Sequence, residues 1–145
     1  MAVYVRTTMQ SFELAPPAMV SAFELMWVGV GATVVGGMYH PPRPQYSTES
    51  LLRCLEVCVE EIHQQFAAAY IVLAGDFHQM SEADVTDHTG LTSIVYQQTS
   101  GANILERIFV SIPCYSNVRV VKAVVRSDHK AIVAHQESVP RSAPA

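Results

Sequence analysis

The hydrophobic and polar positions of the chain divide it into short apolar runs around one long amphipathic segment. Apolar runs of this length, bounded by Gly, Pro or polar residues, are typical of buried strands. The segment Thr7–Pro17 interrupts the pattern and ends in two prolines, so we expect it to be irregular. The runs that predict strands are Ala2–Arg6, Ala22–Val28, Ala32–Met38, Tyr70–Asp76, Ile104–Ser111, Asn117–Val125 and Ala131–Ala134.

Two segments have the pattern of helices. In the first, Ser47 or Thr48 is a suitable N-cap, and the helix is expected to run to about Gln65. In the second, Ser81 begins a short helix and Gly90 suits its C-terminal cap. Apolar residues recur in the first segment at intervals of three and four, which predicts one buried stripe. The stripe consists of Leu51, Leu55, Cys58, Ile62 and Phe66.

The length and composition are typical of a chain that folds as one domain. The chain has 145 residues, of which 50% are hydrophobic and 15% are charged, a balance that excludes a disordered chain. Its net charge of −4 provides no overall basic field, so any contact with nucleic acid requires a local patch.

The same sequence carries no sign of export or of a membrane span. The N-terminus lacks the basic start and apolar core of a signal peptide, and the most apolar region, Leu25–Tyr39, is short and rich in Gly. Three cysteines, an odd number, argue against a disulfide framework and favour buried thiols. We therefore expect an intracellular protein, nuclear or cytoplasmic, that has no membrane partner.

Two aspartates are placed where a metal ion could be held. The strand Tyr70–Asp76 ends abruptly in Gly-Asp, which puts the carboxylate of Asp76 at the rim of a rigid sheet. Asp128 follows another apolar strand. Carboxylate oxygens of this kind suit Mg²⁺, which keeps several waters and takes phosphate oxygens from its substrate.

Four further side chains could complete a hydrolytic site. His129 is a candidate general base for water, and Glu106 is the candidate carboxylate that orients its ring. Tyr39 and His78 could donate hydrogen bonds to a phosphate in its charged transition state. Each of these signals alone is more often an ordinary turn, a packed aromatic or surface chemistry. Their joint order at the ends of strands favours metal-assisted hydrolysis of a phosphodiester.

In this order the motifs resemble the endonuclease/exonuclease/phosphatase superfamily, and most of all the endonuclease domain of non-LTR (LINE-type) retrotransposons. The resemblance implies an α+β fold, a partial four-layer α/β/β/α sandwich with mostly antiparallel sheets, in which the family's N-terminal part is absent. It assigns residues 1–135 to a truncated domain of this type and 136–145 to a flexible polar tail. The matching segments are Met38–Pro42, Leu73–His78, Thr89–Leu91, Gly101–Leu105, Leu105–Arg107 and Ser127–His129.

The resemblance also implies roles for these residues. Asp128 and Asp76 stand at metal-binding positions for Mg²⁺ or Mn²⁺, and His129 stands at the catalytic histidine. Glu106 stands at the carboxylate that orients this histidine. Tyr39 and His78 stand where the family contacts the scissile phosphate, and Arg43, Arg107 and Lys130 are candidates for contacts with the DNA backbone. DNA is the partner that the resemblance implies.

The sequence departs from the family in three places. His78 stands where the family has Asn, Glu106 stands where Asp is usual, and the upstream metal-binding Glu is missing, with Glu13 and Glu24 outside any matching motif. Because small misplacements in an active site slow catalysis strongly, we expect a retrotransposon-derived endonuclease domain with impaired phosphodiester hydrolysis.

Other functions stay open at this point. The chain could be an active phosphodiesterase completed by a dimer partner, a phosphatase, or a non-catalytic module that binds nucleic acid or protein. A truncated sandwich would also leave an apolar sheet surface uncovered, through which copies of the chain could associate.

Overall fold

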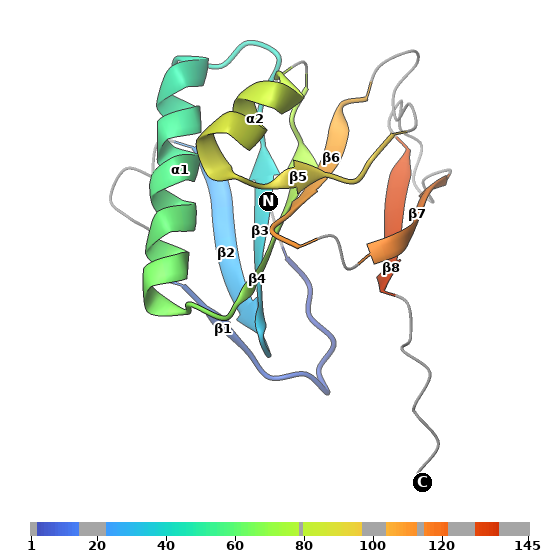
Figure 1. Ribbon diagram of the computed structural model, residues 1–145. Coiled ribbons are helices and arrows are strands. Elements are labelled where there is room, and N and C mark those ends of the chain that lie inside the picture. The colour runs from blue at the N-terminus through green and yellow to red at the C-terminus, as the bar shows by residue number, and fades with distance from the viewer. Residues whose placement is uncertain are drawn as a thin grey trace, which may run out of the picture.

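The computed structural model of the chain describes residues 3–14, 23–78, 80–96, 104–112, 115–121 and 130–136. Within these ranges the chain forms two helices and eight strands (Figure 1). The elements are β1 (Ser11–Glu13), β2 (Glu24–Val30), β3 (Thr33–Tyr39), α1 (Thr48–Gln65), β4 (Tyr70–Asp76), α2 (Glu82–Thr89), β5 (Thr92–Ser93), β6 (Glu106–Val110), β7 (Tyr115–Val121) and β8 (Ala131–Gln136).

The strands form one sheet of six and one of two. The larger sheet has the order β1-β2-β3-β4-β6-β5, and β7 pairs with β8 in the smaller one. Among the strands in the described ranges, only β3 and β4 pair in parallel, and α1 makes the crossover that a parallel pair requires. Both helices lie on one side of the larger sheet and the β7–β8 pair lies on the other, as Figure 1 shows. The expected α+β sandwich with mostly antiparallel sheets is therefore confirmed.

The main core lies between the larger sheet and α1. Alternate residues of β4, such as Ile71 and Leu73, face the helix and are fully buried. They pack against the predicted apolar stripe of α1, in which Leu51 and Leu55 are also fully buried. The thiols of Cys54 and Cys58 are free and buried in the same core. Burial of this stripe fixes α1 on the sheet, as the sequence predicts.

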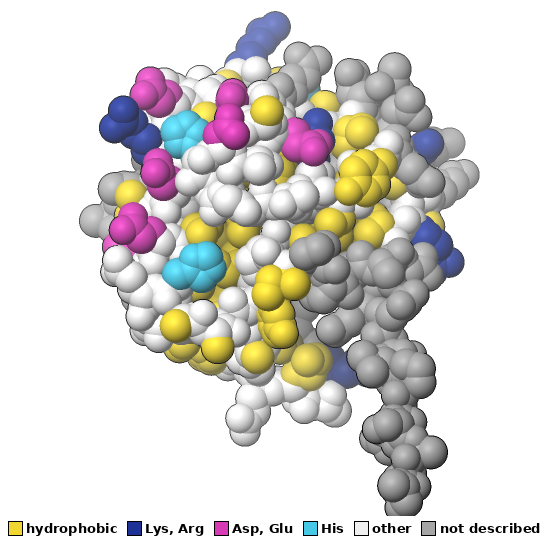
Figure 2. Space-filling view, in the orientation of Figure 1, with side chains coloured by type: hydrophobic (Ala, Val, Ile, Leu, Met, Phe, Trp, Pro, Cys, Tyr) yellow, Lys and Arg dark blue, Asp and Glu magenta, His cyan; other side chains and the backbone are white. Residues whose placement is uncertain are grey.

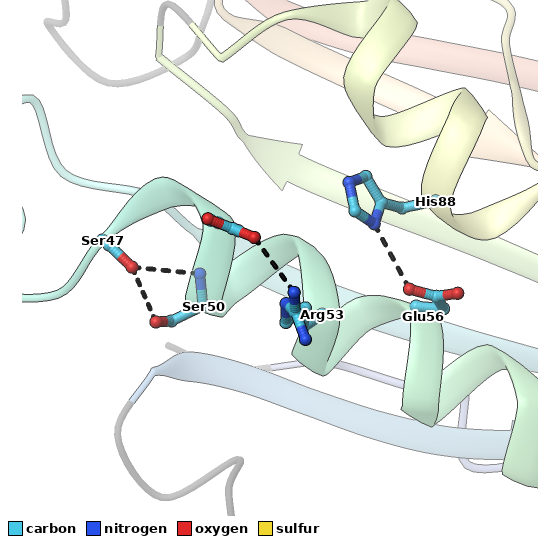
Figure 3. A network of polar contacts seen from close by, with 6 residues as sticks. Ser47, Ser50, Arg53, Glu56 and His88 are labelled. Atoms are coloured by element: carbon cyan, nitrogen blue, oxygen red, sulfur yellow. Dashed lines mark hydrogen bonds and ion pairs between the residues drawn. The ribbon is translucent and has the colours of Figure 1, made fainter.

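Both helices begin at a predicted N-cap, and α2 ends at its predicted C-cap. Ser47 is the N-cap of α1 and its Oγ accepts a hydrogen bond from the backbone N–H of Ser50 at 3.1 Å. Gly90 ends α2 in the left-handed conformation with φ +75°. In Figure 3, His88 of α2 points to Glu56 of α1, and its Nδ1 lies 3.3 Å from a carboxylate oxygen. The two helices therefore form one layer.

The N-terminal strand was predicted in the wrong place. Residues Val3–Arg6 are not in a strand, and β1 lies instead inside the segment that was expected to be irregular. The reason is a tertiary contact: the ring of Phe12 occupies the space over Gly29 of β2, where a Cβ would lie 2.2 Å from the ring. Because Gly29 has no side chain, Ser11–Glu13 can pair with the edge of β2.

The boundaries at the C-terminal end were predicted less well. The strand expected at Asn117–Val125 begins two residues earlier, at Tyr115, and residues 122–129 lie outside the described part of the chain. The last strand extends to Gln136. Residues 137–145, which belong to the predicted flexible tail, also lie outside the described part.

No helix in the described ranges is both long and apolar enough to span a membrane.

Candidate active site at the ends of strands β3, β4 and β6

Four polar residues form one row across the end of the larger sheet. Asp76, the last residue of β4, lies beside Tyr39 in the parallel strand β3. On its other side it lies directly opposite Glu106 of β6. The row continues to Glu24 of β2, which lies directly opposite Tyr39. Three carboxylates and one phenol, brought from four separate stretches of sequence, therefore occupy a single line of the sheet.

The row faces away from the helices. Along β4, Ile71 and Leu73 point into the core under α1, so Asp76, at the alternate parity, points to the opposite face. The side chains of Asp76 and Glu106 are partly exposed, and Tyr39 is 38% exposed. These groups are accessible to a ligand on the face of the sheet that carries the β7–β8 pair.

Gly75 sets the position of Asp76. Its φ of +153° disfavours other residues, and a Cβ at this position would lie 1.8 Å from the backbone oxygen of Met38. The missing side chain allows β4 to approach β3 closely at the point where the strands end. The Gly-Asp pair of the sequence is therefore a structural requirement as well as a chemical signal.

The residues after Asp76 fix its carboxylate. The backbone N–H of His78 donates to Oδ1 of Asp76 at 2.8 Å, and His78 adopts a positive φ of 48° that this tight turn requires. Between them, Phe77 is fully buried against Phe109, with ring centroids 4.9 Å apart. Because the turn is anchored in the core, the carboxylate is held in one orientation at the rim of the sheet.

His40 was not among the predicted site residues, although it is buried directly beside them. Its backbone N–H donates to the carbonyl oxygen of Asp76 at 2.8 Å, and its Nδ1 lies 2.9 Å from the hydroxyl of Tyr46. Burial lowers the pKa of His40, the charge of His78 lowers it further, and Asp76 opposes these effects. His40 therefore joins the end of β4, which its backbone contacts, to Tyr46, which its ring contacts. The only sequence signal was a polar residue between Tyr39 and Pro41.

A pocket of about 310 Å³ lies over the Asp76–Glu106 pair. Lys130 and the first residues of β8 form its other wall, together with Ala74 and Ile108 of the sheet. Asp128 and His129, the remaining predicted site residues, lie outside the described residues. The structure thus brings together Tyr39, Asp76, His78 and Glu106. It also places Lys130, which directly follows His129 in the sequence, in the pocket over Asp76 and Glu106.

The donor set of the row suits a hard divalent cation. Among the described residues, no group of three or more His, Cys, Asp or Glu side chains is arranged to hold a metal ion. Mg²⁺, however, usually binds one or two carboxylates and completes its shell with water and substrate phosphates. Asp76 and Glu106 supply two carboxylates on adjacent strands, directly opposite one another. The residues present therefore fit this kind of ion.

Arg107 has a structural contact. It lies next to Glu106 in β6, but its guanidinium forms an ion pair with Glu82 at the beginning of α2. This pair connects the sheet to the helical layer. Arg43, in contrast, is exposed in the loop after β3.

Charge is distributed unequally over the surface. Acidic side chains gather over α1 and α2 on the side shown in Figure 2. The row and its pocket lie on the other side of the sheet. Two cations, Arg43 and Lys130, line pockets beside the row, which itself carries the carboxylates of Glu24, Asp76 and Glu106.

No protein-family model matches the chain, and neither does any curated protein. Among solved structures, the chain is similar to CdtB, the biologically active subunit of cytolethal distending toxin, with a TM-score of 0.54 and 15% sequence identity. The similar region covers 88% of this chain and 57% of CdtB. CdtB has a DNase I-like fold, and at this identity the similarity concerns the fold alone. The chain thus has a fold of the endonuclease/exonuclease/phosphatase type.

Proposed function

We propose that the chain is a metal-dependent phosphodiesterase domain that cleaves the DNA backbone and derives from a retrotransposon endonuclease. The observation that carries the proposal is the pairing of Asp76 with Glu106 at the rim of the sheet, with Tyr39 on the neighbouring strand. The fold and the ordered motifs of the sequence support it. The retrotransposon origin rests on the motifs alone.

Each residue of the proposed site would have a separate role. Asp76 and Asp128 would hold Mg²⁺, with the charge of Glu106 beside them, and the ion would neutralise charge that develops on the phosphate. The hydroxyl of Tyr39 would donate a hydrogen bond to a non-bridging phosphate oxygen.

A second group would move the proton of the attacking water. In the proposal His129 accepts this proton on one ring nitrogen, while the other nitrogen donates to Glu106. The carboxylate keeps the ring in the required tautomer and stabilises the imidazolium that forms. His78, whose backbone N–H already donates to Asp76, would donate a further hydrogen bond from its ring to a phosphate oxygen.

The electrostatics give the direction of approach. DNA would reach the row from the side away from the acidic helices, with Lys130 and Arg43 contacting phosphates on either side of the scissile bond. Since only a few cations take part, we expect a weak affinity with a shallow dependence on salt concentration.

The test is nicking of supercoiled plasmid by the purified chain in Mg²⁺. Asp76→Asn and His129→Gln should each abolish nicking, whereas Glu60→Gln, a matched carboxylate-to-amide change on α1, should not affect it. Equal nicking by all four proteins would reveal a contaminating nuclease and contradict the proposal. No nicking by a folded wild-type chain would also contradict it and would favour a non-catalytic binding module.

A further inference from the structure

A second pocket lies beside the row and uses Tyr39 as a shared wall. Its volume is about 400 Å³, within the range of pockets that bind small molecules. Unlike an apolar groove, it combines aromatic rings with polar groups of three kinds. We call it the base pocket, and its principal residues are Phe23, Glu24, Tyr39, Arg43, Gln45 and Tyr46.

The aromatic part of the base pocket is rigid. Phe23 and Tyr46 pack edge to face with ring centroids 4.6 Å apart. The hydroxyl of Tyr46 is fixed by Nδ1 of His40 at 2.9 Å, and His40 is itself buried. Tyr39 is partly exposed. Preformed aromatic surfaces of this kind bind planar ligands, nucleobases above all, by stacking.

The polar part suits one nucleotide. Arg43 provides a cation for a phosphate, Gln45 provides an amide, and Glu24 provides a carboxylate. A carboxylate accepts hydrogen bonds from the exocyclic amino group of a base such as cytosine, and thymine has no such group. The charge of Glu24 is felt by Tyr46 inside the pocket. Burial raises the pKa of the Tyr46 hydroxyl most, and the negative charge of Glu24 raises it further.

The location of the base pocket connects it to the row. Glu24 and Tyr39 lie directly opposite one another in β2 and β3, and Tyr39 in turn lies beside Asp76. A strand whose phosphate contacts Tyr39 therefore passes the mouth of the base pocket. A paired base cannot turn into such a pocket, because its edge and faces are occupied in the duplex.

We propose that the base pocket binds one unpaired nucleobase that carries an exocyclic amino group, next to the scissile phosphate. This inference rests on the proposed function and names its substrate class: DNA with an unpaired nucleotide beside the cleavage site. Glu24 gives the preference among bases, the aromatic rings provide stacking, and Arg43 contacts the backbone.

The test is binding of fluorescein-labelled oligo-dC and oligo-dT to the purified chain, measured by anisotropy in EDTA. The wild type should bind oligo-dC at least about five-fold more tightly, in line with one discriminating base contact. Glu24→Ala should reduce this ratio to about one, whereas Glu60→Ala should preserve it. Arg43→Ala should weaken both oligonucleotides equally and reduce the slope of log affinity against log salt by about one.

If the wild type binds the two oligonucleotides equally tightly, this result alone overturns the inference. An unchanged ratio in a folded Glu24→Ala protein would overturn it as well. Because the assay contains no metal and needs no catalysis, its result is independent of nicking. If an Asp76→Asn protein no longer nicks DNA but still prefers oligo-dC, the result supports the base pocket. If the wild type nicks DNA but shows no preference between the oligonucleotides, the base pocket is refuted and the proposed hydrolysis is not.

Discussion

Glu106 lies directly opposite Asp76 across the antiparallel pair β4–β6, on the face of the sheet away from the helices. Opposite residues in such a pair have Cβ atoms about 5 Å apart, and like charges at this distance are unfavourable. In the proposed site Asp76 would hold the Mg²⁺ ion, and Glu106 would add a second negative charge beside it. The pairing therefore links the fold to the proposed chemistry.

Mg²⁺ should stabilise the folded chain through Asp76. At a Mg²⁺ concentration ten times the dissociation constant, the expected gain in the free energy of unfolding is about 1.4 kcal/mol. Asp76→Asn should abolish the Mg²⁺-induced rise in melting temperature, Glu106→Gln should reduce it, and Glu60→Gln should preserve it. Thermal unfolding with and without Mg²⁺ measures this, and an equal rise in all four proteins would contradict a site at Asp76.

Glu106→Asp should increase activity. The family that the sequence resembles has Asp at this position, and we expect the extra methylene of Glu to shift the carboxylate away from its best position for orienting a histidine. Since small displacements in a site change rates strongly, we expect nicking about ten-fold faster or more. Glu106→Gln should instead lose activity. A Glu106→Asp protein slower than the wild type would show that the longer side chain is required.

Gly75→Ala should destabilise the fold severely. Its φ is strained for alanine and the new Cβ would meet the backbone oxygen of Met38 at 1.8 Å, so we expect a loss of about 3 kcal/mol or more. Gly90 is the matched control, because its φ is also positive but nothing lies within 4 Å of a Cβ there. Gly90→Ala should cost only about 1 kcal/mol. Denaturant unfolding compares the two, and equal losses would show that strain alone matters at Gly75.

Stability should fall as the pH drops below about 6.5, the value for an unperturbed histidine. The pKa of His40 is lower in the fold because of burial and the charge of His78, with Asp76 opposing, so the unfolded chain takes up a proton more readily. The stabilisation is therefore complete above the unfolded value and is lost as the pH falls through the folded pKa.

His40→Asn should flatten this part of the pH profile, and so should any change that opens the contact with Tyr46. His63→Asn, at an exposed position of α1, should not flatten it. Chemical unfolding at a series of pH values measures the profile. The same slope in His40→Asn as in the wild type would assign the effect to another group.

Locally encoded features were predicted well from the sequence. Ser47, Ser81 and Gly90 act on the backbone within one helical turn, so the beginnings of both helices and the end of α2 follow from them. The apolar run before Gly75 likewise indicates a buried strand that ends at Asp76. In these cases the physical cause and the residue that signals it are neighbours in the chain.

Features that depend on pairing between distant segments could not be predicted. Glu24 matches no motif, and only the register of β2 against β3 places it in the row. β1 forms because Phe12 fits over Gly29, a contact that no periodicity indicates. His40 lies in the site because its ring contacts the hydroxyl of Tyr46 and its backbone N–H donates to the carbonyl oxygen of Asp76. Motifs mark Tyr39, Asp76 and Glu106 of the row, whereas Glu24 and His40 join them through tertiary contacts that no motif indicates.

The proposed cation site is tested most directly by paramagnetic broadening of assigned backbone amide signals with Mn²⁺. If Asp76 holds the ion, the signals of Asp76, His78 and Glu106 should broaden first, Mg²⁺ should restore them, and Asp76→Asn should prevent the effect. Broadening confined to the acidic side chains of α1 and α2, with the row unaffected, would contradict the cation site and the proposed hydrolysis with it.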